Sequence, residues 1–417
     1  MLYDTWLRVA HERRREFALR DVAAGRSWTF SELRTATERE ASGAGALVYP
    51  QGSGAGFILK TLAAWRDGKV LCPLEPGQPP PSVPLPPAHC IHLKTTSAST
   101  GVARVIAFTA EQLVADAQNI VATMGLRPDW PNLGAISMAH SYGFSNLVLP
   151  LLLHGVPLIL VPSPLPEALR RAAEGWTVLT LAGVPALWRT WHEARAIPPT
   201  IRLAISAGAP LSLEVEKAVF SAGGLKVHNF YGSSECGGIA YDRTEVPRQD
   251  PNCVGVPMQN VGLSLNDEGC LRVHSRAVGE SYWREASSVL SQGYFQTSDL
   301  AELKDGLVCL LGRASDQINV AGRKVFPEII ESALKRHPAV RECVVFGVPS
   351  GQAERGDIIV ACVASTRDHN EALRQFLLAE LPAWQVPREW WCLDSLAADE
   401  RGKVSRAEWR RRFLAQV

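Results

Sequence analysis

A hydroxyl-rich segment is the first feature of this sequence that could do chemistry. Five of the six side chains from Thr95 to Thr100 carry a hydroxyl group, Gly101 ends the run, and Arg104 follows. Backbone N–H groups and hydroxyls in such a loop can surround phosphate oxygens, while a guanidinium neutralises their charge. The segment is not a Walker A loop, because it lacks the G-x-x-x-x-G-K-S/T pattern. Taken alone, it is explained better as a solvated Ser/Thr turn.

Five further segments carry residues that could bind a nucleotide or do catalysis. With the hydroxyl-rich loop, the six segments are residues 96–104, 206–210, 231–235, 293–299, 312–322 and 401–406. In this order they resemble the motifs of the adenylate-forming superfamily, which comprises acyl- and aryl-CoA synthetases, adenylation domains of peptide synthetases and luciferases. Each segment alone could be ordinary structure, whereas six in the correct order indicate membership. The resemblance extends from Trp28 to Arg406.

The resemblance implies a nucleotide site with a magnesium ion. Tyr231 would stack on adenine, Asp299 and Arg313 would contact the ribose, and Glu235 would hold Mg²⁺ through a hard oxygen ligand. The nucleotide-binding residues implied in this way are Thr96, Ser97, Ser99, Thr100, Gly101, Arg104, Gly208, Ala209, Pro210, Tyr231, Gly232, Ser233, Ser234, Asp299 and Arg313.

The resemblance also implies that Lys403 is the catalytic lysine of adenylate formation. In the family, the carboxylate of an acid attacks the α-phosphate of ATP and expels pyrophosphate, and a thiol then displaces AMP from the acyl-adenylate. Lys403 would stabilise the negative charge that spreads over the carboxylate and the α-phosphate in the transition state. The cofactors implied are ATP, Mg²⁺ and either CoA or the phosphopantetheine of a carrier protein.

The sequence leaves three functions open. The first is an AMP-forming acyl- or aryl-CoA ligase, and the second passes the acyl group to an acyl carrier protein instead. Arg323 and Lys324 are basic residues near the expected thiol tunnel and suit both acceptors. The third is a nucleotide-binding pseudoenzyme, which the replacement of the usual Gly and Pro by Ala98 and Ala103 would favour. The joint retention of the expected catalytic and nucleotide-binding residues argues against it.

The segment from Met138 to Phe144 resembles the part of the family that gates the acyl pocket. His140 is expected there as a second catalytic residue, although a core histidine explains it equally well. The segment lacks the aspartate with which amino-acid-activating domains bind an ammonium group, and this disfavours an amino acid. The pocket is expected to take a hydrophobic carboxylic acid, aromatic or medium-chain acyl. The implied pocket residues are His140, Phe144, Gly208, Gly232, Gly237 and Gly238.

The resemblance further implies a mobile C-terminal domain. Ser315 stands at the position of the family's hinge, and a hinge residue must tolerate a large φ/ψ change. Rotation about this hinge would bring the turn at Ala321 and Gly322 to the thiol tunnel, where small residues let a pantetheine arm pass. Lys324 stands where some CoA synthetases carry a phosphate-binding arginine.

The elements that must position these residues alternate between helices and buried strands. This alternation up to Val246 predicts layered parallel sheets with helices on both faces, and shorter strands to about Leu311 predict a small β subdomain. Helix and strand alternate again after Phe326, which predicts a small α+β domain. The expected domains are an N-terminal AMP-binding domain, residues 1–312, and a mobile C-terminal domain, residues 313–417.

Composition excludes several other classes of protein. The formal net charge of +1 argues against nucleic acid as a partner, and 46% hydrophobic with 20% charged residues is typical of a globular enzyme. Nine cysteines without a C-x-x-C pair argue against a disulfide framework and favour a cytoplasmic location. The apolar stretch at residues 146–161 is interrupted by Pro150, Gly155 and Pro157, so no membrane span is expected.

Overall fold

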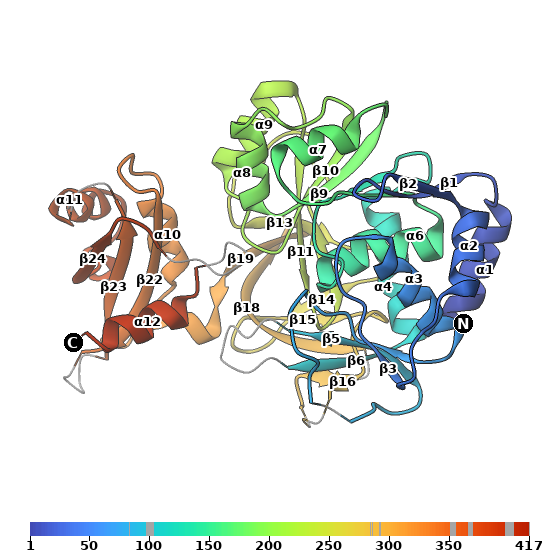
Figure 1. Ribbon diagram of the computed structural model, residues 1–417. Helices are drawn as coiled ribbons and strands as arrows, with labels where there is room; N and C mark the ends of the chain where they lie inside the picture. The colour runs from blue at the N-terminus through green and yellow to red at the C-terminus, as the bar shows by residue number, and fades with distance from the viewer. Residues whose placement is uncertain are drawn as a thin grey trace.

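The computed structural model describes residues 1–82, 84–96, 104–283, 285, 287–291, 293–350, 356–365, 370–396 and 404–416. It is a mixed α/β molecule with a large sheet-rich N-terminal part and a small C-terminal part at one end (Figure 1). The fold class expected from the sequence is therefore confirmed. The domain boundary at residues 312 and 313 stays a prediction, although the 3₁₀ turn η2 (Ala314–Asp316) lies beside it.

Parallel strands form the centre of the main sheet. In the described part of the chain they lie in the order β11–β10–β9–β7–β8–β1, and each neighbouring pair is parallel. Their residues are mostly apolar and buried, as is typical of strands that are covered on both faces. The strands are β1 (Phe17–Asp21), β7 (Asn132–Gly134), β8 (Leu158–Leu160), β9 (Leu179–Gly183), β10 (Ile201–Ser206) and β11 (Val227–Ser233), with β2 (Arg26–Thr29) antiparallel at the edge.

Helices cover both faces of these strands (Figure 1). Ile159 packs into the core beneath α7, α8 and α9, whereas its neighbours Leu158 and Leu160 pack into the core shared with α1 to α4 and α6. This alternation is the two-residue period of a strand. The helices are α1 (Leu2–Glu12), α2 (Phe30–Arg39), α3 (Ala55–Arg66), α4 (Ala110–Met124), α5 (Ser141–Gly143), the π-helical η1 (Phe144–Val148), α6 (Leu149–His154), α7 (Pro166–Ala173), α8 (Pro185–Glu193) and α9 (Leu213–Gly223).

A second, smaller sheet carries the hydroxyl-rich loop. Its order is β16–β6–β5–β4–β3, and the loop joins the antiparallel strands β5 and β6, where Thr95 pairs with Val105. The loop is therefore fixed at both ends by a strand. The strands are β3 (Leu47–Val48), β4 (Val70–Leu71), β5 (Cys90–Thr95), β6 (Val105–Thr109) and β16 (Ser281–Tyr282).

The antiparallel strands after β11 continue the main sheet. β12 folds back beside β11 and pairs with β13, so hydrogen bonds run without a break through β19 and β18 to β15 and β14. The β subdomain expected from the sequence is thus an extension of the main sheet. Its strands are β12 (Gly237–Tyr241), β13 (Cys253–Pro257), β14 (Gly262–Leu265), β15 (Cys270–His274), β17 (Leu290–Ser291), β18 (Tyr294–Lys304) and β19 (Leu307–Arg313).

The C-terminal part is a three-stranded sheet between helices. β23 pairs antiparallel with β22 and parallel with β24, and two separate apolar cores cover its faces. β24 and α12 are not anticipated by the sequence analysis. The elements are the hairpin β20 (Ile318–Val320) and β21 (Arg323–Val325), α10 (Pro327–Leu334), β22 (Glu342–Pro349), β23 (Asp357–Ala364), α11 (Asn370–Glu380), η4 (Ala383–Gln385), β24 (Glu389–Leu393) and α12 (Arg406–Leu414).

Candidate functional site

Asp299, Tyr231 and Arg313 meet at the end of the β18–β19 ladder. Asp299 pairs with Arg313 across the two strands, and Arg313 Nε donates a hydrogen bond of 3.2 Å to Asp299 Oδ1. Tyr231, on β11, donates from its hydroxyl to Asp299 Oδ2 at 2.5 Å. Burial, and then the adjacent Asp299 carboxylate, raise the pKa of Tyr231 well above its usual 10, so the phenol stays a neutral donor. Three residues from separate motifs therefore form one hydrogen-bonded group.

The hairpin between β11 and β12 presents Glu235 and a series of small residues. Gly232 lies opposite Gly238, and a Cβ atom on Gly232 would lie 2.6 Å from the carbonyl oxygen of Gly237. Ser233 Oγ accepts a hydrogen bond of 3.2 Å from the Glu235 backbone N–H, which holds the turn that also contains Ser234. The tight turn thus depends on glycine at position 232 and on the Ser233 hydroxyl.

Glu235 is connected to the base of the hydroxyl-rich loop through an aromatic residue. Tyr282, on β16, donates a hydrogen bond of 3.0 Å to Glu235 Oε1. The guanidinium of Arg104 lies 4.9 Å from the centre of the Tyr282 ring, and its Nε lies 3.3 Å from Glu285 Oε2. Tyr282 therefore brings the expected magnesium ligand and the expected phosphate-binding cation to one place, which the sequence analysis did not foresee.

Glu235 fits a magnesium ion held mainly by phosphates. Among the described residues, no three His, Cys, Asp or Glu side chains cluster as a metal site. Magnesium commonly binds through one or two carboxylates together with substrate phosphates and water. A single carboxylate near the base of the expected phosphate-binding loop is consistent with that mode.

Two hydrogen bonds join the ends of the hydroxyl-rich loop. The Thr96 N–H donates to the Arg104 carbonyl at 2.8 Å, and the Arg104 N–H donates to Thr96 Oγ1 at 3.0 Å. These bonds continue the hairpin beyond the last strand pair. Ser97, Ser99, Thr100, Gly101 and the expected catalytic Lys403 lie outside the described residues, and their roles stay predictions.

The turn after β10 approaches the same edge of the sheet. Gly208 has a φ angle of +87°, which an L side chain rarely adopts, and Ala209 and Pro210 complete the turn. The carboxyl ends of neighbouring parallel strands share one edge, so the ends of β10 and β11 bring Gly208 and Tyr231 to a common side. In open α/β sheets this is the edge at which ligands bind.

His140 and Phe144 have different surroundings, although they are only four residues apart. His140 Nε2 lies 2.8 Å from Glu75 Oε1, and the His140 side chain is about one-third exposed. Phe144 is buried in the main core, where its ring lies 4.6 Å from the ring of His92. The ion-pair contact with Glu75 argues that His140 is not an ordinary core histidine. Phe144, in contrast, is buried as a core residue is. Their parts in an acyl pocket stay predictions.

The expected thiol-tunnel turn is a two-residue hairpin loop. Ala321 and Gly322 connect β20 to β21 with φ angles of +51° and +82°, and Asn319 Oδ1 accepts a hydrogen bond from the Gly322 N–H. Such a turn requires positive φ at both central residues, which is costly for Ala321. Lys324 is exposed on β21, and the Ser315 hydroxyl lies 3.3 Å from Asp316 in the turn η2.

Arg406, three residues after Lys403 in the sequence, forms a group of ion pairs beside the expected hinge. Its guanidinium forms ion pairs with Asp316, Glu328 and Glu331, and its Nε donates to the Val345 carbonyl at 2.8 Å. Although burial opposes the charged form, the three carboxylates raise the pKa of Arg406 further. The sequence motif contains Arg406, but only the structure shows which groups it holds together.

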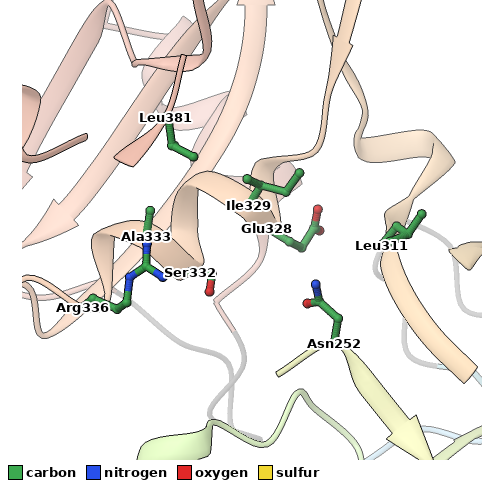
Figure 2. Close-up of a pocket in the computed structure, with 8 residues that line it drawn as sticks. All are labelled: Asn252, Leu311, Glu328, Ile329, Ser332, Ala333, Arg336 and Leu381. Carbon is green, nitrogen blue, oxygen red and sulfur yellow. The ribbon is translucent and has the colours of Figure 1, made fainter. Parts of the chain in front are cut away.

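A cavity of about 240 Å³ opens between the two parts of the chain (Figure 2). Figure 2 shows Asn252, just before β13, and Leu311, on β19, facing Glu328 and Ile329 on α10. None of the residues expected to bind nucleotide or acid lines it. The cavity therefore belongs to the junction beside the expected hinge.

A buried ion pair that no sequence motif indicates lies behind the β11–β12 hairpin. Lys94 on β5 and Asp116 on α4 are both at least 95% buried, with Lys94 Nζ 3.7 Å from Asp116 Oδ2. A lysine in a largely buried strand and an aspartate among the buried residues of α4 were the available signals. Neither residue belongs to the motifs that carry the family resemblance.

Membrane insertion has no support in the helices. Among the residues that the structure describes, every helix is too short or too polar to cross a bilayer.

Comparison with known proteins places the chain in a family. The model of the AMP-binding enzymes matches residues 56–295, and that of the AMP-binding enzyme C-terminal domain matches residues 329–403. The chain therefore belongs to the AMP-binding enzyme family, within the adenylate-forming superfamily. It is an enzyme of the AMP-forming acid–thiol ligase type, similar to acyl- and aryl-CoA synthetases.

Individual relatives and one solved structure are similar to most of this chain. A probable 2-succinylbenzoate–CoA ligase of Mycobacterium tuberculosis is 31% identical over 342 residues, which cover 78% of this chain and 84% of the relative. A feruloyl-CoA synthase of an Amycolatopsis species is 27% identical over 357 residues, covering 80% and 72% of the two chains. The solved structure of ATP-bound MatB from Rhodopseudomonas palustris is 20% identical with a TM-score of 0.85, covers 99% of both chains and shows the shared fold.

Proposed function

We propose that this enzyme uses ATP to convert an aryl or medium-chain acyl carboxylic acid into an acyl-adenylate, and then transfers the acyl group to CoA. The observation that carries the proposal is the hydrogen-bonded group of Tyr231, Asp299 and Arg313, with Glu235 in the turn that follows Tyr231. The two donors orient the Asp299 carboxylate, whose oxygens can then accept hydrogen bonds from the hydroxyls of a ribose. The names of the relatives, which include a feruloyl-CoA synthase, support an acid with an aromatic or apolar body.

The first step forms a bond between the acid and the nucleotide. A carboxylate oxygen of the acid attacks the α-phosphorus of ATP, the bond to the β-phosphate bridging oxygen breaks, and pyrophosphate leaves. The hydroxyl-rich loop and Arg104 would hold the leaving phosphates in line for this displacement. Glu235 would hold Mg²⁺, which when bound neutralises charge on the phosphates. Lys403 would stabilise the charge that the acid and the α-phosphate share in the transition state.

The second step exchanges AMP for a thiol. The thiolate of CoA attacks the acyl carbon, the bond from that carbon to the phosphate oxygen breaks, and AMP leaves. The proposed rotation of residues 313–417 about Ser315 would withdraw Lys403 and bring the Ala321–Gly322 turn to the thiol. Arg323 and Lys324 are exposed on β21, where their charge suits the phosphates of CoA.

The proposal is tested by acid-dependent exchange of labelled pyrophosphate into ATP in the presence of Mg²⁺. We expect exchange with aryl or medium-chain acids and a loss of about 100-fold or more in Lys403→Ala, because a charge-stabilising group is removed. Lys60→Ala changes an exposed lysine on α3 and should leave exchange unchanged. An enzyme that binds ATP but exchanges with no acid would contradict the proposal.

The acceptor is tested separately with the same acid. Thioester formation is measured with free CoA and with a phosphopantetheinylated carrier protein at equal concentration. We expect CoA to be used at least tenfold more efficiently. Preference for the carrier protein would retain adenylation but overturn CoA as the acceptor.

A further inference from the structure

Lys94, on β5, is a buried cation close to the β11–β12 hairpin. Its side chain is 4% exposed, and its ammonium lies 4.4 Å from the centre of the Phe108 ring. Within the described residues, Nζ has no hydrogen-bond partner, because the 3.7 Å to Asp116 Oδ2 is too long for one. An ammonium group carries three donors, and burying them unpaired is unfavourable. Such a group is expected where a ligand completes the site.

Asp116 connects Lys94 to the β11–β12 hairpin. Its Oδ2 accepts a hydrogen bond of 2.6 Å from Ser145 Oγ, and its Oδ1 accepts a hydrogen bond of 3.4 Å from the Gly238 N–H. A Cβ atom on Gly237 would lie 2.0 Å from Asp116 Oδ1, so a side chain there would displace the carboxylate. The ion pair therefore lies directly behind the hairpin that begins at Tyr231.

Three glycines let the hairpin backbone pack closely against the ion pair and its neighbours. Gly232 and Gly238 pair across the hairpin, and Gly237 touches Asp116. A Cβ atom on Gly238 would lie 2.2 Å from Met258 Sδ. A flat acid lying along this backbone, with its reacting carboxylate near the nucleotide, would direct its far end towards Asp116 and Lys94.

We propose that Lys94 determines specificity for an acid that carries a second oxygen acceptor, such as a carboxylate, keto or phenolic oxygen, at the end remote from the reacting carboxylate. The proposal rests on the function proposed above and names the substrate class of the same site. The acceptor oxygen would bind Lys94 Nζ, while Asp116 keeps the ammonium charged and oriented. An acid without such an oxygen would leave the ammonium unpaired. Sites that hydrogen-bond a substrate group discriminate strongly against analogues that lack it.

The experiment compares acids that share a skeleton and differ only in the remote oxygen. Benzoate is compared with 3-hydroxybenzoate, 4-hydroxybenzoate and isophthalate, and hexanoate with 6-hydroxyhexanoate and adipate. For each pair, kcat/KM of pyrophosphate exchange gives one ratio, which does not depend on the fraction of folded enzyme. In the wild type we expect a ratio of about 100 in favour of at least one oxygen-bearing acid. Equal efficiency within every pair would overturn the proposal.

Lys94→Met tests whether Lys94 is the cause. Methionine keeps the length and apolar body of the side chain but has no donor. We expect the ratio to fall at least tenfold through loss of the oxygen-bearing acid, while benzoate or hexanoate is retained. Lys60→Met, at an exposed site on α3, should keep the wild-type ratio.

The remaining outcomes are also decisive. An unchanged ratio in folded Lys94→Met would assign Lys94 a structural role and overturn the proposal. Should Lys94→Met fail to fold, Lys94→Gln keeps a donor without the charge and is expected to lower the ratio for isophthalate and adipate more than for the hydroxy acids. A wild type that exchanges with no acid would instead overturn the proposed function.

Discussion

Two buried charge clusters in the N-terminal part differ in how completely they are hydrogen-bonded. In the first, Lys226 pairs with Glu216 and Asp242, and Arg248 donates to Glu216 and to three backbone carbonyls. In the second, Lys94 faces Asp116 at 3.7 Å, and among the described residues its ammonium has no hydrogen-bond partner. Both clusters are withdrawn from water, so the difference does not come from burial.

The difference separates structural charges from functional ones. A buried ion pair is tolerated when the geometry is good and the remaining donors and acceptors are paired. The Lys226–Arg248 cluster meets this condition and joins α9, β11 and the segment before β13. The Lys94–Asp116 pair does not meet it, and it lies beside the hairpin of the proposed active site. We propose that the substrate is the partner that completes the hydrogen bonding of Lys94.

The largest expected effect is a loss of stability when the fully hydrogen-bonded Lys226–Arg248 cluster is broken. Arg248→Ala removes a buried partner of Glu216 and leaves acceptors unpaired, which should lower the free energy of unfolding by about 3–5 kcal/mol. The ratio of kcat/KM values between paired acids should not change. Urea unfolding at pH 7 measures the first quantity, and Arg243→Ala is the exposed control. A loss below about 1 kcal/mol would show that the cluster is not structural.

The ion pairs around Arg406 extend the comparison to the C-terminal part. Arg406→Gln should slow pyrophosphate exchange about tenfold or more, because Arg406 follows the expected catalytic Lys403 by three residues in the sequence and catalytic groups are sensitive to misplacement. Thioester formation from preformed acyl-adenylate should change less, since that step does not use Lys403. Both are measured by single-turnover assay. Arg410→Gln, which removes one exposed hydrogen bond to the Gly347 carbonyl, is the matched control, and equal slowing in both variants would contradict a specific role for Arg406.

Tyr231→Phe tests a polar group of the expected nucleotide site that is already hydrogen-bonded within the protein. The variant keeps the ring for stacking but removes the 2.5 Å hydrogen bond to Asp299. A net loss of about 1 kcal/mol corresponds to a roughly fivefold higher KM for ATP. The selectivity among acids should not move, because the acid-side pair is untouched. Steady-state kinetics with ATP varied measures both, and an altered selectivity would argue against two separate clusters.

The smallest expected effect is a pH dependence of stability. Burial lowers the pKa of Lys94 from its usual 10.5, although Asp116, Cys236 and Glu235 act in the opposite direction. Between the folded-state pKa and 10.5 the unfolded chain binds more protons than the folded chain, so stability rises with pH in this window. The difference in unfolding free energy between the wild type and Lys94→Met should therefore shift in favour of the wild type as pH approaches 10.5. Urea unfolding at several alkaline pH values tests this, and a constant difference would contradict the buried-ammonium account.

Much of the fold could be predicted from the sequence. Apolar strands alternating with helices predict the parallel centre of the main sheet, because both faces of its strands are buried. The α+β character of the C-terminal part follows from the same reasoning. The continuation of the sheet through β12 and β13 could not be predicted, because it depends on which strand edges meet and not on local preference. β24 and α12 were not predicted either. The residues of α12 are strongly charged and show little apolar pattern.

The residues of the candidate site could be named from the sequence, but most of their contacts could not. Motif residues such as Asp299 and Glu235 could be named from the sequence, although their roles remain predictions. The sequence does not show that Tyr282 joins Glu235 to Arg104, because these residues come from three separate segments. It also does not show that Glu75 contacts His140, since Glu75 precedes the proline-rich segment and belongs to no motif.

The class of this protein follows from the order of its six motifs, which can be read without coordinates. The same motifs name the residue types that are available for phosphates, ribose and metal. Which polar groups are paired, and which are not, is visible only in the three-dimensional arrangement. Pairing depends on distances of a few ångström between segments far apart in the chain, and Lys94 and Asp116 are such a case. Their significance follows from burial and incomplete hydrogen bonding, which no local pattern encodes.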